Sequence, residues 1–496
     1  MREAEGGRAL AYSKEWLTPI TTSLAKTQST TITTTKQVII VDTDLKRGLS
    51  QRHINMIAVG SAIGVGLFLG SASAIKSAGP SIILAYALCG AAILFIIRAL
   101  GEMAVTNPVA GSFSRYANDY IGPLAGFITG WTYWFLWAAD GMAELSAIAL
   151  YMKAWYPTVP SWVWAFSALI IMPPFNLMAV KAFGEFEFWV SLIKIITVIL
   201  MLAIGLGMIV FGFGNDGVAT GISNMWSHGG FFPNGTMGWL LALPMVGFAY
   251  VGIEIIGTTA GEAKNPERAL AKAVNTIFWR VLFFYVGALV VILSVFPWTE
   301  ITSDSSPFVM IFAKLGIPSA AGIVNFALLT TALSAINTGL FSNGRMLFNL
   351  SEQGQAPVWL KKVNRAGIPI NAVLVSLATL VVGGLLNYSA PESVFIWMTA
   401  IATFGAIWTW GIILYSHYRF RKDIAPQGGK FKAPLYPFGS IFAGGFLLLI
   451  IVVMSFQEDT RVAVIVGPIW LLLMTAVYYV GGYHKLNRKF GVIPEK

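Results

Sequence analysis

Long, uninterrupted runs of apolar residues constrain this chain most, because a run of about 20 residues is the length of helix that crosses a bilayer. Twelve such runs are predicted, at about 54–78, 81–104, 123–152, 160–179, 188–213, 238–260, 276–297, 319–349, 371–388, 393–416, 434–455 and 463–483. Lipid offers no hydrogen bonds, so each run must satisfy its own backbone, as a helix does. Hydrophobic residues make up 56% of the chain and charged residues only 11%, too few for the surface of soluble domains. We predict an all-α integral membrane protein with twelve transmembrane helices.

The predicted loops differ in their content of lysine and arginine. If the N-terminus is cytoplasmic, 28 of the 33 basic residues fall on the cytoplasmic side, four lie outside, and Lys194 lies within a span. Basic residues concentrate in cytoplasmic loops, so we expect both termini in the cytoplasm and the chain in the inner (plasma) membrane. The net charge of +10 is assigned to these loops, and no nucleic-acid partner is expected.

Composition also divides the chain into regions. Residues 1–46 are polar and rich in Ser and Thr, which predicts a disordered cytoplasmic tail. Residues 47–485 form the predicted transmembrane domain, and 486–496 form a cytoplasmic C-terminal tail. One Cys and four widely spaced His give neither a disulfide framework nor a metal-ligand pattern. We therefore expect no metal and no cofactor.

Glycines interrupt the first and the sixth predicted spans. They are Gly60, Gly64, Gly66 and Gly70 in the first span, and Gly252 and Gly257 in the sixth. Each costs roughly 1 kcal/mol in a helix interior, which favours an unwound segment; packing of small residues between helices is the alternative for Gly60 and Gly64. Interrupted spans at corresponding positions predict an inverted repeat of five plus five helices, about 54–213 and 238–416, with the binding site between them. Two extra helices would follow at about 434–483.

Several short motifs carry a family resemblance. They are the segments 45–49, 60–68, 78–81, 98–103, 183–189, 252–254, 260–267, 306–308 and 345–347. With these motifs the chain resembles a bacterial amino-acid permease of the amino acid–polyamine–organocation superfamily, over about 45–485. The resemblance is strongest to proline- or histidine-type members of the amino acid transporter branch. It implies a fold like that of LeuT and an amino-acid substrate, while leaving open which amino acid.

An unwound segment in mid-membrane exposes backbone groups that bind the charged ends of an amino acid. We expect the substrate carboxylate at the N–H groups of Val65 and Gly66, where half-helix dipoles favour anions. The ammonium group should meet carbonyl groups of the two breaks. The predicted substrate-binding residues are Ser61, Ala62, Ile63, Gly64, Val65, Gly66, Asp140, Phe248, Ala249, Tyr250, Gly252 and Glu254. Phe248 and Tyr250 are expected to cover or gate the substrate, and Glu254 either to bind ammonium or to orient the backbone.

Ionisable residues within spans are costly and therefore functional candidates. With span five starting near 188, Lys194 lies roughly 9 Å into the helix, and partial snorkelling is the alternative to a coupling role. The resemblance implies that Lys194 replaces a sodium ion, contacts spans one and eight, and couples transport to protons. It also implies proton coupling at Glu144, with a structural hydrogen bond as the alternative. Asp140, one turn earlier on the same face, departs from the family pattern and favours histidine or another substrate with a basic side chain.

The predicted function is proton-coupled import of a neutral or histidine-like amino acid by alternating access. The predicted partners are the amino acid, protons and the lipid bilayer, and the protein is expected to function as a monomer. An antiporter would share every motif and stays open as an alternative. A membrane enzyme or sensor is disfavoured, because no nucleophile and base lie together.

Near the inner end of span two, Arg98 and Glu102 have the spacing of an ion pair within one helix.

Overall fold

The computed structural model describes residues 52–53, 56, 60, 63–107, 109, 111–176, 180–259, 274–276, 279, 281–302, 305–364, 367–423 and 431–485. This part of the chain is helical and contains no strand beyond an isolated bridge between Val363 and Pro369. The predicted tails, 1–46 and 486–496, lie outside the described residues. The expectation of an all-α protein is therefore confirmed for the described part.

Eight helical segments in the described ranges are long and apolar enough to cross a membrane. They are Gly70–Thr106, Ala182–Phe211, Val274–Val295, Ser319–Glu352, Ile370–Ser389, Val394–Asp423, Phe438–Phe456 and Glu458–Val480. A shorter apolar helix, α9, covers Gly235–Phe248. These segments belong to a multi-pass membrane protein, while the count of twelve spans stays a prediction.

The boundaries of most predicted spans agree closely with the helices. Helices that correspond to spans three, four and eight to twelve are α6 (Pro123–Lys153), α7 (Ser161–Asn176), α14 (Pro318–Glu352), α15 (Ile370–Ser389), α16 (Val394–Asp423), α17 (Phe438–Phe456) and α18 (Glu458–Val480). The second span is α4 (Ile82–Thr106), and the seventh includes a π-helical turn, η4 (Val281–Gly287), that leads into α12 (Ala288–Val295). Two short helices, α5 (Ser112–Tyr120) and α13 (Pro307–Lys314), were not predicted.

Helix α8 (Val180–Phe211) begins earlier than the predicted start of span five near 188, so that prediction is wrong. Glu185 and Glu187 precede the predicted start, and both lie within the helix. Glu185 pairs with Arg52, and Glu187 is buried among polar partners. Lys194 is thus fourteen residues from the helix start, about 21 Å at 1.5 Å per residue. At 3% exposure, its ammonium group does not snorkel to the surface.

Both predicted interruptions are present. In the first span, Ile63 and Gly64 are not helical, α2 covers only Val65–Phe68, and α3 follows as Gly70–Ala78. In the sixth span, α9 ends at Phe248 and α10 resumes at Ile255–Thr259, so residues 249–254 form turns. Gly252 lies in this stretch with φ +95°, a conformation that favours glycine.

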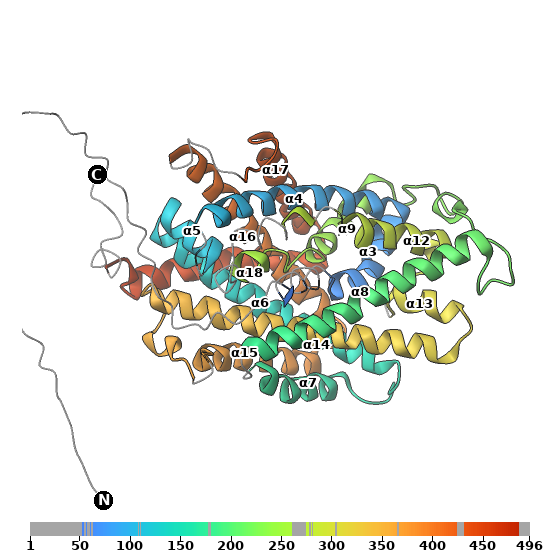
Figure 1. The fold of residues 1–496 in the computed structure, drawn as a ribbon, viewed down its shortest axis with the longest axis horizontal. Coiled ribbons are helices and arrows are strands. Elements are labelled where there is room, and N and C mark those ends of the chain that lie inside the picture. Colours follow the sequence, from blue (N-terminus) through green and yellow to red (C-terminus); the bar gives the residue numbers. More distant parts are fainter. Residues whose placement is uncertain are drawn as a thin grey trace, which may run out of the picture. The chain divides into compact units, whose positions relative to one another are not determined.

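The helices around the two breaks pack against one another (Figure 1). Helix α3 packs along α9, so the second half of the first span lies beside the first half of the sixth span. Helix α6 packs against α14 and α16, and α14 also contacts α8. On another side, α17 packs against α4, α9 and α18. This packing brings spans one, three, five, six and eight to a common centre.

Candidate functional site

The two interrupted spans touch at Gly66 and Ala249. A Cβ atom built on Gly66 would lie 2.6 Å from Ala249 Cα and 3.0 Å from Phe248 Cδ1. Carbon atoms in contact normally lie about 3.5–4.0 Å apart, so no side chain larger than hydrogen fits without movement. The glycine at 66 therefore permits the close backbone approach that the breaks require.

A small polar cavity opens beside this crossing point. Counting the space open to the centres of water molecules, its volume is about 40 Å³, enough for a few waters. It is lined by Gly60, Ile63, Gly64, Val65, Gly66, Trp137, Asp140, Glu144, Glu187, Lys194, Phe248, Ala249, Val251, Ala335 and Thr338. Backbone of both breaks and four ionisable side chains thus line the same cavity.

Lys194 connects three of the spans around this cavity. Its Nζ atom lies 3.5 Å from the carbonyl oxygen of Gly60 and 3.1 Å from Ser334 Oγ, to both of which it donates. Gly60 belongs to the first span and Ser334 to α14, the eighth span. These are the two spans that Lys194 is predicted to contact. The ammonium group therefore bridges α8, the first span and α14.

Glu187 stands behind this bridge and was missed as a site residue. Its carboxylate accepts a hydrogen bond from Ser334 Oγ at 2.7 Å and one from Asn337 Nδ2 at 2.8 Å. Asn176 Nδ2 in turn donates to Asn337 Oδ1 at 2.6 Å. All four side chains are buried. The carboxylate of Glu187 thus fixes Ser334, and through it one of the two acceptors of Lys194.

Three residues of α6 face the cavity at helical spacing. Asp140 and Glu144 are 5% and 3% exposed, and Trp137 lies one turn before Asp140. One oxygen of Glu144, Oε2, is buried and has no hydrogen-bond partner among the described residues. A buried polar atom without a partner is uncommon and needs an explanation. A substrate, water or proton at this oxygen would supply one.

Glu254 holds the turn of the sixth span from behind. It accepts a hydrogen bond from the backbone N–H of Gly252 at 3.3 Å and another from Trp410 Nε1 of α16 at 3.1 Å. It is fully buried and does not line the cavity. Of the two roles predicted for Glu254, these contacts match the orientation of the unwound backbone.

Tyr250 also points away from the cavity. Its hydroxyl group donates to the carbonyl oxygen of Tyr86 at 2.8 Å, and its ring stacks on that of Tyr285 at 4.6 Å. The hydroxyl group of Tyr285 donates to the carbonyl oxygen of Ala249 at 2.9 Å. That carbonyl lies in the sixth-span break, so these tyrosines fix the position of the break against α4 and the π-helical turn.

The predicted site residues therefore fall into three groups. Those on the cavity wall are Ile63, Gly64, Val65, Gly66, Asp140, Glu144, Lys194, Phe248 and Ala249. Tyr250, Gly252 and Glu254 support the sixth break without lining the cavity. Ser61 and Ala62 lie outside the described residues. Trp137 and Thr338 line the cavity without having been predicted; the spacing from Trp137 to Asp140 and Glu144 is the sequence signal for the first of them.

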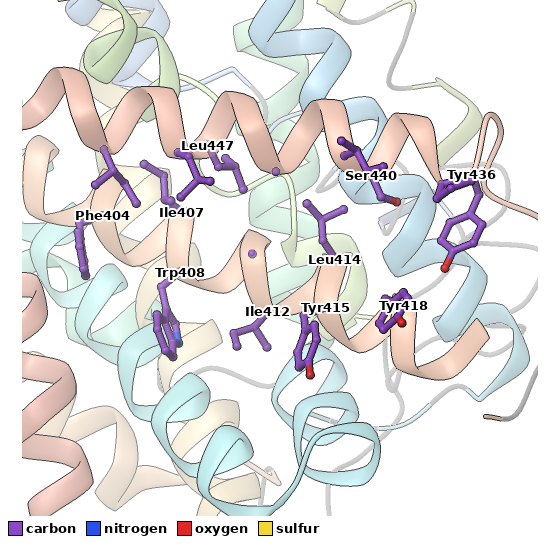
Figure 2. A pocket seen from close by; sticks show the side chains of 16 residues that line it. Phe404, Ile407, Trp408, Ile412, Leu414, Tyr415, Tyr418, Tyr436, Ser440 and Leu447 are labelled. Carbon is purple, nitrogen blue, oxygen red and sulfur yellow. The ribbon is translucent and has the colours of Figure 1, made fainter. Parts of the chain in front are cut away.

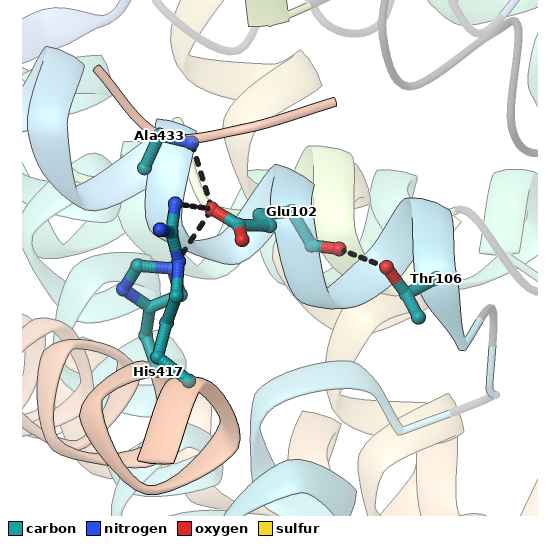
Figure 3. Close-up of polar contacts among 5 residues, drawn as sticks. Glu102, Thr106, His417 and Ala433 are labelled. Carbon is teal, nitrogen blue, oxygen red and sulfur yellow. Dashed lines mark hydrogen bonds and ion pairs between the residues drawn. The ribbon is translucent and has the colours of Figure 1, made fainter. Parts of the chain in front are cut away.

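A second buried polar cluster lies at the other end of α4 (Figure 3). Glu102 Oε2 accepts from Arg421 Nη2 at 2.7 Å and from the backbone N–H of Ala433 at 2.7 Å, and His417 Nε2 lies 3.0 Å away. The guanidinium group of Arg98 instead lies over the ring of Phe431. The pairing of Arg98 with Glu102 is thus replaced by a cluster that ties α4 to α16 and to the segment before α17.

A polar cavity at the meeting point of two interrupted helices, in a chain with several membrane-length helices, is typical of secondary transporters. The chain matches the family model described as amino acid permease over residues 53–493. It belongs to this family, which confirms the resemblance deduced from its motifs.

Three proteins of Bacillus subtilis (strain 168) illustrate the similarity. The chain is 59% identical over 447 residues to the uncharacterized amino acid permease YtnA, with 90% of this chain and 96% of that protein covered. It is 50% identical to the probable threonine/serine transporter YbxG, with 89% and 96% covered. It is 44% identical to the amino-acid permease AapA, with 88% and 95% covered.

Proposed function

We propose that this permease imports a small amino acid together with protons, by alternating access around the central cavity. The carrying observation is that Lys194 bridges the broken first span and α14 within a cavity that also contains Asp140 and Glu144. The substrate carboxylate binds at the N–H groups of Val65 and Gly66. The ammonium group binds at carbonyl groups of Ile63 and of the sixth-span break, because the carbonyl end of a half-helix carries partial negative charge.

Coupling follows from the bridge made by Lys194. In its protonated form the side chain attracts the Gly60 carbonyl and Ser334, and so holds the first span against α8 and α14. Loss of the proton removes the charge from these hydrogen bonds, and charged hydrogen bonds are roughly twice as strong as neutral ones. The first span is then released, and the unpartnered oxygen of Glu144 provides a proton acceptor in the same cavity.

The cavity favours a small, polar substrate. Its volume is small, and its wall combines the hydrogen-bond acceptors of Asp140 and Thr338 with the aromatic rings of Trp137 and Phe248. A hydroxyl group on the substrate would donate to such acceptors. The 50% identical relative is described as a probable threonine/serine transporter, so we propose serine or threonine as substrates ahead of proline and histidine.

The remaining architecture is proposed in the form that the sequence predicts. The chain has twelve spans, five plus five in an inverted repeat and two more, in the plasma membrane with both termini in the cytoplasm. It functions as a monomer.

Uptake of labelled amino acids into proteoliposomes tests the substrate. We expect serine or threonine uptake to follow an inward proton gradient, and Asp140→Ala to lower it about 10-fold or more, the effect of losing a hydrogen bond to a charged group. Asp423→Ala, which changes an exposed carboxylate paired with Arg419, is the control. Uptake only in exchange for preloaded internal amino acid would contradict symport and show that the protein is an antiporter. Histidine uptake that depends on Asp140 would contradict serine or threonine as the substrate.

A further inference from the structure

A long apolar groove separates α16 from α17 (Figure 2). Its volume is about 590 Å³, and it is open along one side. Aliphatic and aromatic side chains such as Ile407, Leu414 and Leu447 form its walls. Since both helices are apolar segments of membrane-spanning length, the groove belongs to the part of the protein that lipid surrounds.

Glycines form part of the groove floor on both sides. Gly411 of α16 and Gly444 of α17 line the groove, and a Cβ atom on either would meet nothing within 4 Å. The space at these glycines is therefore unfilled by other side chains of the described chain. A groove of this size between two packed helices requires an occupant, because an apolar void forfeits the contacts of its walls.

The length of the groove matches one leaflet of a bilayer. Its α16 wall runs from Phe404 to Tyr418, fourteen residues or about 21 Å. Its α17 wall runs from Ser440 to Ile451, eleven residues or about 17 Å. The hydrocarbon core of a bilayer is about 30 Å thick, so one leaflet contributes about 15 Å. A transmembrane partner helix spans the whole core of about 30 Å, which is longer than either wall of the groove.

The two ends of the groove differ in polarity. Tyr415, Tyr418 and Tyr436 gather toward one end, whereas Phe404 and Leu447 lie at the other (Figure 2). Tyrosine is typical of the membrane–water interface. The tyrosine end is therefore the headgroup end of the groove, and the other end lies deeper in the hydrocarbon.

Basic side chains flank the tyrosine end. The guanidinium group of Arg421 lies 4.7 Å from the ring centre of Tyr436. Lys422 follows Tyr418 by four residues, which places it one turn further along the same face. It is exposed and forms no ion pair with another described residue. Basic groups at the headgroup level between helices attract anionic lipid headgroups.

We propose that this groove binds a phospholipid with an anionic headgroup, with one acyl chain between α16 and α17 and the headgroup at Arg421 and Lys422. The occupant is a membrane lipid rather than a second protein, because the groove spans one leaflet and ends at basic residues. Helix α16 also carries Trp410, the partner of Glu254. The bound lipid thus lies against the helix that supports the sixth-span break.

Native mass spectrometry of the purified full-length protein tests the site, with added phosphatidylglycerol as the probe and phosphatidylethanolamine as the neutral comparison. We expect one phosphatidylglycerol retained per wild-type chain, and none in Gly444→Leu, whose side chain fills the groove. Gly445→Leu is the matched control, since Gly445 also has open space around it but does not line the groove. Gly411→Leu repeats the test from the other wall if Gly444→Leu does not fold.

The headgroup is tested separately. Lys422→Gln should retain lipid but lose about fivefold of its preference for phosphatidylglycerol, the effect of one basic residue at an anionic surface. Equal retention by Gly444→Leu and wild type would overturn the proposal. A change of oligomeric mass in Gly444→Leu would also overturn it, because the groove would then be an interface between copies. Equal binding of both lipids by the wild type would refute the anionic specificity.

Discussion

The close contact between the two breaks allows the effect of Gly66→Ala on substrate affinity to be predicted. The added methyl group would lie 2.6 Å from Ala249 Cα, so the two backbones must separate by about 1 Å to reach normal contact. Overpacking of this kind costs about 1–3 kcal/mol. The substitution therefore raises the free energy of the conformation in which the two breaks touch. The population of that conformation falls about 5- to 150-fold.

We expect Gly66→Ala to weaken apparent substrate affinity by this factor, because a binding-competent state that is less populated binds proportionally less. The assay is concentration-dependent uptake in proteoliposomes, with expression and melting temperature measured in parallel. Gly247→Ala is the matched control, since a Cβ atom at Gly247 would meet its nearest neighbours at an ordinary 3.4–3.5 Å. Unchanged affinity in a folded Gly66→Ala protein would refute the close approach of the two spans.

Two further substitutions test the supports of the site. Glu187→Gln places an amide opposite the donors Ser334 and Asn337, and leaving a buried donor unpaired costs about 1–3 kcal/mol. Gradient-driven uptake should therefore fall more than substrate exchange across the membrane, and an equal fall in both would contradict a role in coupling. Trp410→Phe removes the donor to Glu254 and should lower the free energy of unfolding by about 1–3 kcal/mol. A thermal-shift assay checks this, and an unchanged melting temperature would show that the indole contributes nothing to the sixth break.

Local sequence signals predicted the helices and their interruptions. Apolar runs predict the ends of α6, α14 and α15 closely, because a bilayer leaves little freedom in where an apolar helix begins or ends. The glycines of the first and sixth spans predicted the breaks, since their cost in a helix interior is a local property. These features depend on residues close together in the chain.

Contacts between residues far apart in the chain could not be predicted from the sequence. Glu187 is absent from the predicted site residues because its partners Ser334 and Asn337 lie 147 and 150 residues away. Only the fold shows that they satisfy a buried carboxylate. Tyr250 adjoins the break, and this position in the sequence predicts that it covers or gates the substrate. Within an unwound segment no helical period says which way a side chain points, and its hydroxyl group is bonded to Tyr86 instead.

The most direct test of the account compares wild type with Lys194→Ala in proteoliposomes that hold an inward proton gradient, with labelled threonine and serine. We expect the variant still to bind substrate and to exchange it across the membrane, but no longer to accumulate it when the gradient is applied. Lys194→Arg, which keeps a charge but does not release its proton, should behave like Lys194→Ala in accumulation. Accumulation by Lys194→Ala at the wild-type level would contradict the coupling role of Lys194.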